Sequence, residues 1–487
     1  MDRPLKILFV TAEMSPLIST GGLAEVANAL PKALHARGHD VRVIMPCFRE
    51  IPEEHRGESY CLCVADLGSR AEHGALRRSM VPGTEIPLYL VEHEGFFGRA
   101  TPYGTGASEF PDNAERFCFF CQAVLHGIPQ TWWKPDIVHC HDWHAASVPV
   151  YLRSKYQKDA YWEGVSSLLT IHNLGYQGQY PAEKFENTGF DDELLSPEFL
   201  EFHGDLNLLK GGIVFAGRLN TVSPRYAREI QTPEYGAGMD GVLRTRRDHL
   251  TGILNGVDYD TWNPAIDGII AAPYARDALA GKQACKKRLQ EMAGLPVKDT
   301  PVFGVVSRLY WQKGLDLVVD ALGDLMKMDV QLVVLGSGEP GLERRLRQAQ
   351  QEHPDRVHVL PKYEQDLARH VFAGSDFFLM PSRYEPCGLG QMYALAYGAV
   401  PIVRRTGGLS DTVRDVNGAS LKDGSANGLV FVPLTPGSIV RTVQRAIDLY
   451  NAPDTMLQIR HTGMRHEYSW DRSSREYVDL YRRAMAG

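Results

Sequence analysis

The chain lacks a large excess of either charge and has no long uninterrupted apolar run. Its 487 residues carry a net charge of −7. Such a balance provides no general attraction for nucleic acid or for an anionic membrane surface. No apolar stretch reaches the length of about 20 residues that a membrane-spanning helix needs. We therefore expect no nucleic-acid or membrane partner, and a phosphate-bearing substrate must be held by a few placed cations.

Cysteine is scarce, and its eight positions form no repeating pattern. Cys118 and Cys121 form a C-x-x-C, but they lie in the apolar run FCFFC without the second pair that a structural zinc site needs. We expect a buried helix face there, and reduced thiols, which are typical of the cytoplasm. The N-terminal segment MDRPLKILFVTAEM lacks a small-residue cleavage site, so we expect no signal peptide.

Two stretches of the chain alternate short apolar strands with amphipathic helices, which is the pattern of a parallel sheet covered on both faces. The first contains KILFVTA, IVHC and SLLTIH, and the second contains PVFGVVSR, QLVVLG and DFFLMP. The sequence therefore predicts two doubly wound α/β domains. Ligands of such sheets bind beyond the carboxyl ends of the strands, so we expect the active site in a cleft between the domains.

A polar, turn-rich segment, NGVDYDTWNPAIDG, separates the two stretches and predicts a hinge. We assign residues 1–255 to an N-terminal Rossmann-like domain and residues 256–465 to a C-terminal one. A helix near Arg475–Met485 follows, and we expect residues 466–487 to pack back onto the N-terminal domain.

Polar loops follow the predicted strands of the first domain. Gly21 and Gly22 stand where a helix begins. Either the backbone approaches a ligand there and offers free N–H groups to an anion, or a tight turn merely needs positive φ. His172 lies at the end of the strand SLLTIH, where its place favours a functional role without deciding it.

The segment His139–His144 follows the strand IVHC. Its three histidines and one aspartate suggest a metal, but side chains alternate in direction at a strand end, so we expect no convergence and no metal site. Asp142 beside Trp143 favours a sugar site, with a carboxylate for hydroxyls and an indole for the C–H face. The structural alternative is that Trp143 fills the core and Asp142 caps the next helix.

The second domain carries the strongest chemistry. Arg308 and Lys313 lie on one loop before a helix. Arginine offers planar, forked donors to phosphate oxygens and lysine a point charge, so with the helix dipole they could clamp a diphosphate; solvated surface charges are the alternative. Glu385 precedes another helix, and it either faces the cleft or is a solvated helix cap. The pair Gly407 and Gly408 repeats the pattern of Gly21 and Gly22.

The segment Gly336–Gly341 matches the G-x-G-x-x-G pattern of dinucleotide-binding proteins. That pattern needs an acidic strand end about twenty residues further on, where this chain reads HVLPKY. We therefore interpret it as a turn that approaches the cleft with backbone only.

Taken together, these motifs resemble those of the bacterial glycogen synthase and plant starch synthase family. They occur in order over nearly the whole chain, as TGGL from Thr20, HDWH from His141, IHNL from Ile171, LNGVD from Leu254, SRL and KG from Ser307 and Lys313, EPCGL from Glu385 and RTGGL from Arg405. The resemblance implies a GT-B fold, with two Rossmann-like domains facing a cleft. It also implies transfer of glucose from ADP-glucose to the non-reducing end of an α-1,4-glucan such as glycogen, with retention of configuration and without metal or cofactor.

The resemblance also implies roles for individual residues. The first domain carries the acceptor side, and the second binds the nucleotide-sugar donor. Arg308 and Lys313 bind the diphosphate, and Glu385 contacts the donor glucose. Asp142 and His172 lie at the reacting sugar. The remaining implied donor-site residues are Asn255 near the 6-hydroxyl, Tyr363 stacking on the base, and Thr20, Gly21, Gly22, Cys387, Gly388, Leu389, Thr406, Gly407 and Gly408.

One position departs from the family pattern. The family has a lysine before its Thr-Gly-Gly-Leu, and this chain has Ser19. Either Arg308 and Lys313 suffice, or another residue substitutes, or donor preference or activity is altered. An active glycogen synthase is the main hypothesis. The alternatives are a glucan-binding regulatory homologue with weak or lost catalysis, and a transferase that uses another donor such as UDP-glucose.

Overall fold

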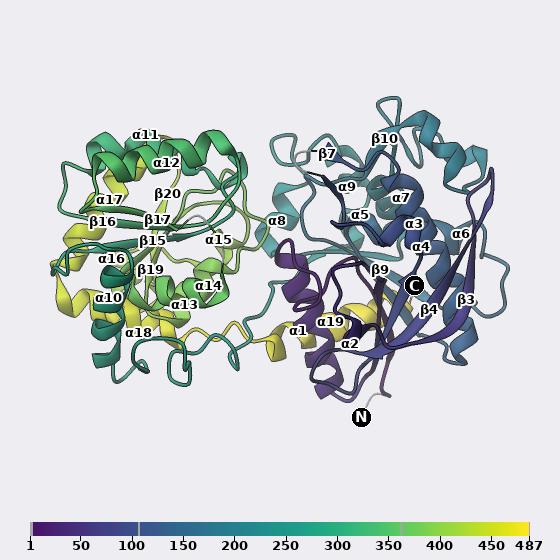
Figure 1. Cartoon of the computed structure of the whole chain (residues 1–487), viewed down its shortest axis with the longest axis horizontal. Helices are drawn as coiled ribbons and strands as arrows, with labels where there is room; N and C mark the ends of the chain where they lie inside the picture. Colours follow the sequence, from purple (N-terminus) through teal and green to yellow (C-terminus); the bar gives the residue numbers. More distant parts are fainter. Residues whose placement is uncertain (1–2, 106–107, 361, 363, 487) are drawn as a thin grey trace. The chain divides into compact units, whose positions relative to one another are not determined.

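The structure, a computed structural model, describes residues 3–105, 108–360, 362 and 364–486. The chain divides into two compact units (Figure 1). Unit 1 consists of Met1–Gly256 and Trp470–Gly487, and unit 2 consists of Val257–Ser469. The unit boundaries thus lie one residue after the predicted boundary at 255 and four residues after that at 465.

Unit 1 contains a nine-stranded sheet in the order β14-β13-β9-β8-β1-β2-β5-β4-β3. The strands from β14 to β5 are parallel, whereas β4 and β3 extend the sheet as an antiparallel edge. The strands are β1 Lys6–Val10, β2 Asp40–Pro46, β3 Glu58–Asp66, β4 Ala71–Met80, β5 Pro87–Glu92, β8 Ile137–His141, β9 Ser166–Ile171, β13 Arg218–Thr221 and β14 Leu250–Gly252.

The central strands of unit 1 are almost continuously buried, as expected for a parallel sheet covered on both faces. Helices α1 (Gly22–Ala36) and α19 (Trp470–Met485) pack together, and α4 (Asn113–Gly127) packs against α5 (Asp142–Ala145) and α6 (Ser147–Arg153) (Figure 1). Cys118 and Cys121 on α4 are fully buried, which confirms the buried helix face.

Helix α19 belongs to unit 1 although the chain reaches it only after unit 2. It begins at Trp470 rather than near Arg475. Its Tyr481 hydroxyl lies 2.8 Å from Nδ1 of His139, and its Tyr477 hydroxyl donates to Oδ1 of Asn220 at 2.9 Å. All four side chains are buried, so the last helix completes the core of the first unit.

Unit 2 contains a six-stranded parallel sheet in the order β17-β16-β15-β18-β19-β20. Its strands are β15 Val302–Val306, β16 Gln331–Leu335, β17 Val357–Leu360, β18 Phe377–Met380, β19 Val400–Arg404 and β20 Leu429–Phe431. When the strands are numbered within the unit, this is the Rossmann order 3-2-1-4-5-6. The order of strand addition reverses between β15 and β18, and this position is the topological switch point of the sheet.

The helices α11 (Leu315–Leu325), α12 (Pro340–Glu352) and α17 (Pro436–Tyr450) cover one face of this sheet (Figure 1). The other face is covered by α10 (Ala280–Met292), α13 (Gln365–Gly374), α14 (Gly390–Ala396) and α18 (Pro453–Arg465) (Figure 1). The predicted architecture of two doubly wound α/β units is confirmed. No helix of the described residues is long and apolar enough to span a membrane.

Candidate active site

In unit 2 the predicted site residues follow β15, β18 and β19, which are neighbours in the sheet. Nζ of Lys313 donates to both carboxylate oxygens of Glu385, at 2.8 and 2.7 Å. Ser382 Oγ donates to the same carboxylate at 2.9 Å. Glu385 is only 5% exposed, so it is not the solvated helix cap of the alternative interpretation. This ion pair lies at the switch point of the sheet, where doubly wound folds bind ligands.

Arg308 is the second residue after the end of β15, and its side chain is exposed. Its guanidinium carbon is 5.6 Å from the ring centre of Tyr310. Lys313 ends a short 3-10 turn, Trp311–Lys313, immediately before Gly314 and α11. The two cations thus share one strand-to-helix loop, but they are not equivalent, because Lys313 is held by an ion pair and Arg308 extends toward solvent.

The glycine pair after β19 is required by close packing between loops. Gly407 has a φ of +41°, and a Cβ added to it would lie 1.9 Å from the carbonyl oxygen of Glu385. At Gly408 an added Cβ would lie 2.1 Å from the oxygen of Cys387, and the Gly408 amide donates to the Glu385 carbonyl at 3.1 Å. Because no side chain intervenes, the loop that begins at Thr406 rests directly on the loop of Glu385.

The remaining predicted residues of unit 2 take up several positions. Cys387 is buried, and the side-chain nitrogen of Gln391 donates to its carbonyl oxygen at 3.1 Å. Gly388 has a φ of +72°, and Leu389 is the N-cap of α14. Thr406 is buried and is the N-cap of α15 (Gly407–Thr412). Tyr363 lies outside the described residues.

The G-x-G-x-x-G pattern after β16 also packs backbone against backbone. An added Cβ at Gly336 would lie 1.9 Å from the oxygen of Ser307, and one at Gly338 would lie 2.5 Å from the oxygen of Leu309. These glycines let the segment rest directly on the loop of Arg308, and the expectation that it approaches a ligand stays a prediction.

In unit 1 the first loop contains a buried carboxylate that belongs to none of the sequence motifs. Glu13 is 4% exposed and accepts hydrogen bonds from the backbone N–H of Thr20 at 2.7 Å and from its hydroxyl at 2.6 Å. The Tyr103 hydroxyl donates to the same carboxylate at 2.7 Å. Glu13 thereby holds the segment that precedes the glycine pair. A carboxylate three residues beyond the end of β1 was the signal available in the sequence.

Gly21 and Gly22 differ from the pair after β19. Neither has positive φ, and a Cβ added to either has no atom within 4 Å. The alternative that this turn needs positive φ is therefore wrong. Gly21 is the N-cap of α1 and makes no side-chain cap, so amides of the first turn stay available beside open space. Ser19 is exposed on the same loop.

Asp142 and His172 lie together at the carboxyl ends of the neighbouring strands β8 and β9. Oδ1 of Asp142 accepts the backbone N–H of His172 at 2.7 Å, and Asp142 itself has a φ of +55°. Burial raises the pKa of Asp142 to about 7, although the amides of His172 and Asn173 act in the opposite direction and the charge of Glu13 adds to the rise. Burial lowers the pKa of His172 to about 3, so its imidazole is neutral at neutral pH.

Trp143 does not support the sugar-platform interpretation. Its indole is 4% exposed and packs edge-on against Phe117, with ring centres 4.9 Å apart. It fills the core, as the structural alternative held. Asp142 does not cap the following helix, because it is the first residue of α5 and His141 is the N-cap.

Two of the three histidines in the segment His139–His144 do not point apart, contrary to our expectation, because both lie within β8. His139 and His141 share one face of the strand, with ring centres 4.0 Å apart, because they are two residues apart. Nδ1 of His141 lies 2.9 Å from Nε2 of His172, and both nitrogens of His139 bond to hydroxyls, of Tyr481 and Thr170. Among the described residues no group of three or more His, Cys, Asp or Glu could hold a metal ion.

Asn255 is 5% exposed, and its Oδ1 is buried without a hydrogen-bond partner among the described residues. Such an acceptor is costly to leave unpaired, and a ligand hydroxyl could satisfy it.

The unusual pKa of Asp142 predicts a change of stability with pH. Between about pH 4 and pH 7 the folded protein keeps a proton that the unfolded chain has released, so the free energy of unfolding falls as pH rises. The gap from 3.8 to about 7 corresponds to ~4 kcal/mol. We expect Asp142→Asn, which still accepts the His172 N–H, to stabilise the protein by about this amount at pH 8 and by little near pH 4.

Denaturant unfolding followed by tryptophan fluorescence at pH 4 to 8 measures this effect. Asp376 provides a control of opposite sign. Burial acts against its charge, yet Lys286 and Arg460 hold its pKa below the ordinary value. Asp376→Asn should therefore destabilise the protein across this range, with little dependence on pH, because the range lies above the ordinary carboxyl pKa of 3.8. An Asp142→Asn variant whose stability gain does not grow with pH would contradict the prediction.

Comparisons with known proteins find relatives that match this chain over nearly its whole length. A family model described as starch synthase catalytic domain matches residues 6–245, and one described as glycosyl transferases group 1 matches residues 287–459. The glycogen synthase of Syntrophotalea carbinolica is 43% identical over 484 residues and covers 99% of both chains. Glycogen synthase 1 of Methylococcus capsulatus is 44% identical over 491 residues, which cover 99% of this chain and 97% of that one.

Among solved structures, the catalytic domain of starch synthase IV from Arabidopsis thaliana, bound to ADP and acarbose, matches with a TM-score of 0.91 and 31% identity over 100% of both chains. Sucrose-phosphate synthase from Thermosynechococcus elongatus, at 17% identity and a TM-score of 0.59, shares the fold alone. The resemblance and the GT-B fold expected from the sequence are confirmed. The chain therefore belongs to the glycogen and starch synthase family of glycosyltransferases.

Proposed function

We propose that this chain is a glycogen synthase that transfers glucose from ADP-glucose to the non-reducing end of an α-1,4-glucan, with retention of configuration and without metal. The observation that carries the proposal is the pair of the partly buried Lys313 and the buried Glu385 at the switch point of unit 2, with the Gly407–Gly408 backbone packed against the loop of Glu385. The relatives named glycogen synthase and the ADP-bound starch synthase structure support the choice of donor and acceptor.

The chemistry of the donor site follows from charge. When the bond between glucose and the diphosphate breaks, negative charge builds on the departing ADP. We assign its neutralisation to Arg308 and Lys313, assisted by the amides where the neighbouring helices begin. Glu385 then has two tasks: its carboxylate fixes the direction of the Lys313 ammonium, and it contacts the hydroxyls of the donor glucose. Gly388, Leu389, Thr406, Gly407 and Gly408 line the donor, and Cys387 supports them from its buried position.

Unit 1 supplies the groups at the reacting sugar. His172 is neutral, so it acts as a hydrogen-bonding group rather than as a cation. Nε2 of His141 has no partner among the described residues, and a bare ring nitrogen is cheaper to bury than an orphan N–H. This favours a His141 proton on Nδ1, donated to Nε2 of His172, and leaves the His172 proton on Nδ1 for a glucose hydroxyl.

Asp142 and Asn255 add acceptors for sugar hydroxyls, and Thr20, Gly21 and Gly22 offer amides to the donor. A retaining transfer without a covalent intermediate needs a proton acceptor on the face that the leaving phosphate occupies. We assign that role to the departing phosphate itself, which takes the proton of the attacking glucan hydroxyl as the new bond to glucose forms.

Ser19 provides a test of donor use. The exposed serine stands where the family has a lysine, so the first loop lacks one cation. We expect Ser19→Lys to lower the KM for ADP-glucose about three- to tenfold with a smaller change in kcat, because an added surface cation strengthens binding of the diphosphate. Ser19→Met is the control for side-chain length without charge.

The decisive experiment is incorporation of labelled glucose into glycogen from a panel of donors that includes ADP-glucose and UDP-glucose. Preference for ADP-glucose supports the proposal. A preference for UDP-glucose overturns the donor assignment, and binding of glycogen without incorporation from any donor favours the regulatory homologue. Turnover that is lost on addition of a chelator contradicts the metal-independent step.

A further inference from the structure

Trp132 is the most exposed large apolar residue among the described residues, with 94% of its surface accessible. It follows the short 3-10 helix Ile128–Thr131 and has a φ of +55°, a left-handed conformation that disfavours residues with a Cβ. Neither core packing nor backbone geometry therefore explains a tryptophan there. The next residue is a contrast, because Trp133 is 5% exposed and donates its Nε1–H to Asp40 at 2.6 Å.

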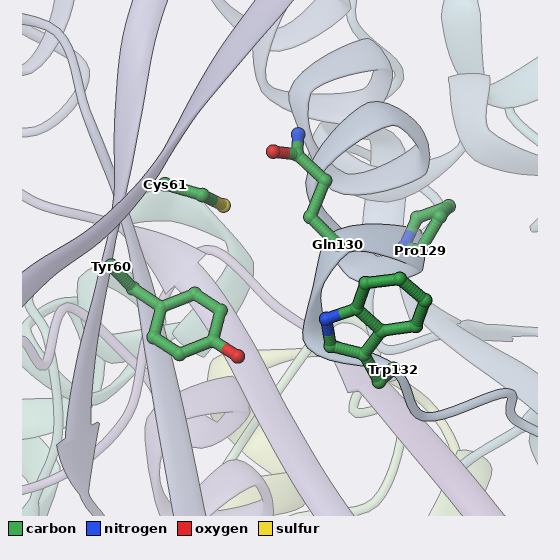
Figure 2. A pocket seen from close by; sticks show the side chains of 5 residues that line it. All are labelled: Tyr60, Cys61, Pro129, Gln130 and Trp132. Atoms are coloured by element: carbon green, nitrogen blue, oxygen red, sulfur yellow. The ribbon is translucent and has the colours of Figure 1, made fainter.

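Trp132 lines a hollow of about 510 Å³ with other aromatic and polar groups. Figure 2 shows the Tyr60 ring on the strand side of the hollow and the Trp132 indole on the opposite side, with Gln130 and Pro129 next to the indole. Tyr60 and Cys61 belong to β3, the outer strand of the unit 1 sheet. Tyr60 is 40% exposed, so two aromatic faces are accessible in one depression.

The lining is held in place by its own contacts. Nε2 of Gln130 donates to the carbonyl oxygen of Leu62 on β3 at 2.9 Å and to that of His126 at 3.2 Å. These bonds tie the turn of Trp132 to the neighbouring strand. The Tyr60 ring packs against Tyr89, with ring centres 6.4 Å apart. The two aromatic groups are thus presented by anchored elements.

We propose that this hollow is a second glucan-binding site, separate from the catalytic loops. Indole and phenol rings offer apolar faces on which the C–H faces of glucose units stack, while the Tyr60 hydroxyl and the Gln130 amide offer polar partners to sugar hydroxyls. A flat aromatic face that stays exposed to water suits a ligand that is apolar on its ring faces and polar at its edges. The choice of an α-glucan as the ligand rests on the proposed function.

The site lies at the edge of the unit 1 sheet opposite the catalytic loops. Trp132 precedes β8, and Asp142 follows it. The hydrogen bond of Trp133 to Asp40 places this segment at the edge where the parallel strands begin, because Asp40 is the first residue of β2. A five-residue strand separates the two edges by roughly 16 Å. A short oligosaccharide bound at the hollow therefore cannot reach Asp142, whereas a long or branched glucan can occupy both places.

Holding a polymer at the hollow would raise the concentration of its chain ends around the enzyme. Occupation of a second site makes binding at the first effectively intramolecular, so the apparent affinity for a long acceptor rises without a new contact at the catalytic residues. The benefit should be confined to acceptors such as glycogen and absent for maltotriose.

Trp132→Gly and Trp132→Phe test the proposal. Glycine relieves the positive φ and removes the ring, and phenylalanine keeps an aromatic face. In affinity electrophoresis without donor, we expect Trp132→Gly to weaken glycogen binding at least tenfold and Trp132→Phe about threefold. Trp132→Gly should melt at the same or a higher temperature than the parent chain, so lost binding would not reflect lost structure. Ile266→Ala, at another residue with 65% exposure, is the control and should change nothing.

Kinetic measurements complete the test. In Trp132→Gly we expect the KM for glycogen to rise at least fivefold while kcat/KM for maltotriose stays within twofold. Unchanged glycogen affinity in Trp132→Gly overturns the proposal. A second result also overturns it. If the parent chain self-associates in sedimentation velocity, and Trp132→Gly abolishes this association but still binds glycogen, the hollow is a contact between protein chains. Because binding is measured without donor, a failure of glucose transfer in every chain counts against the proposed function and leaves this result standing.

Discussion

Replacing Lys313 with alanine is expected to lower kcat/KM for ADP-glucose by roughly a hundred- to a thousand-fold, the usual effect of removing one donor from a site of developing negative charge. Lys313 is the cation at the switch point of unit 2, and its ammonium is held by both oxygens of Glu385. The loss should appear in initial-rate measurements of glucose incorporation into glycogen. Part of it should persist at saturating donor, because the charge matters most as the diphosphate departs.

The same substitution leaves the 5%-exposed carboxylate of Glu385 without its cation, so stability must be separated from chemistry. Lys286 provides a matched control, since it forms a 2.8 Å ion pair with the buried Asp376 in the same unit. Asp376 precedes β18, whereas Glu385 follows it, so the control pair lies at the opposite edge of the sheet. Lys286→Ala should cost stability and leave kcat per folded molecule within about twofold. Unaltered turnover in Lys313→Ala would remove the central assignment of the donor site.

Introducing a single methyl group at Gly407 should have the second large effect. The added Cβ would lie 1.9 Å from the carbonyl oxygen of Glu385, and the φ of +41° is strained for alanine. The two loops must therefore separate, and we expect Gly407→Ala to lower the free energy of unfolding by about 3 kcal/mol. We also expect it to raise the KM for ADP-glucose at least tenfold, because the loop of Glu385 moves with the clash.

A glycine with no such neighbour serves as the comparison. Gly323 lies within α11 of the same unit, and an added Cβ there has no atom within 4 Å. Gly323→Ala should stabilise the helix by roughly 0.5–1 kcal/mol and leave the KM unchanged. Thermal unfolding and donor titrations of the two variants give the comparison. Equal behaviour of both would show that the two loops do not need direct backbone contact.

The sequence was sufficient to predict the fold class, and it placed the candidate site residues on loops that follow strands, as the structure has them. Strands such as KILFV and IVHCH are buried along nearly their whole length, so hydrophobic runs and the residues that end them were reliable signals. Lys313 and Glu385 follow strands that are neighbours in the sheet. An alternation of strands and helices in the sequence predicts a parallel sheet, but it does not specify the order of the strands. The direct ion pair of Lys313 and Glu385 was not predicted, because pairing depends on which two strands are neighbours.

Other features depend on contacts that no local pattern contains. The two glycine pairs look alike in sequence, yet Gly407 is required by the oxygen of Glu385 and Gly21 faces open space. Glu13 was missed because its importance comes from Thr20 and from Tyr103, the latter ninety residues away. The sequence also does not distinguish two tryptophans near β8, since Trp143 is buried and Trp132 is exposed.

Helix α19 imposes an order on the synthesis of this protein. Its Tyr481 and Tyr477 supply partners to His139 and Asn220 in the middle of the first sheet, yet the ribosome releases them only after all of unit 2. Unit 2 can complete its fold earlier, while the core of unit 1 stays incomplete until the helix that begins at Trp470 has been synthesised. A chain that terminates before this helix would thus expose the interior of unit 1, which is synthesised first. Proteases and chaperones can then recognise the incomplete translation product.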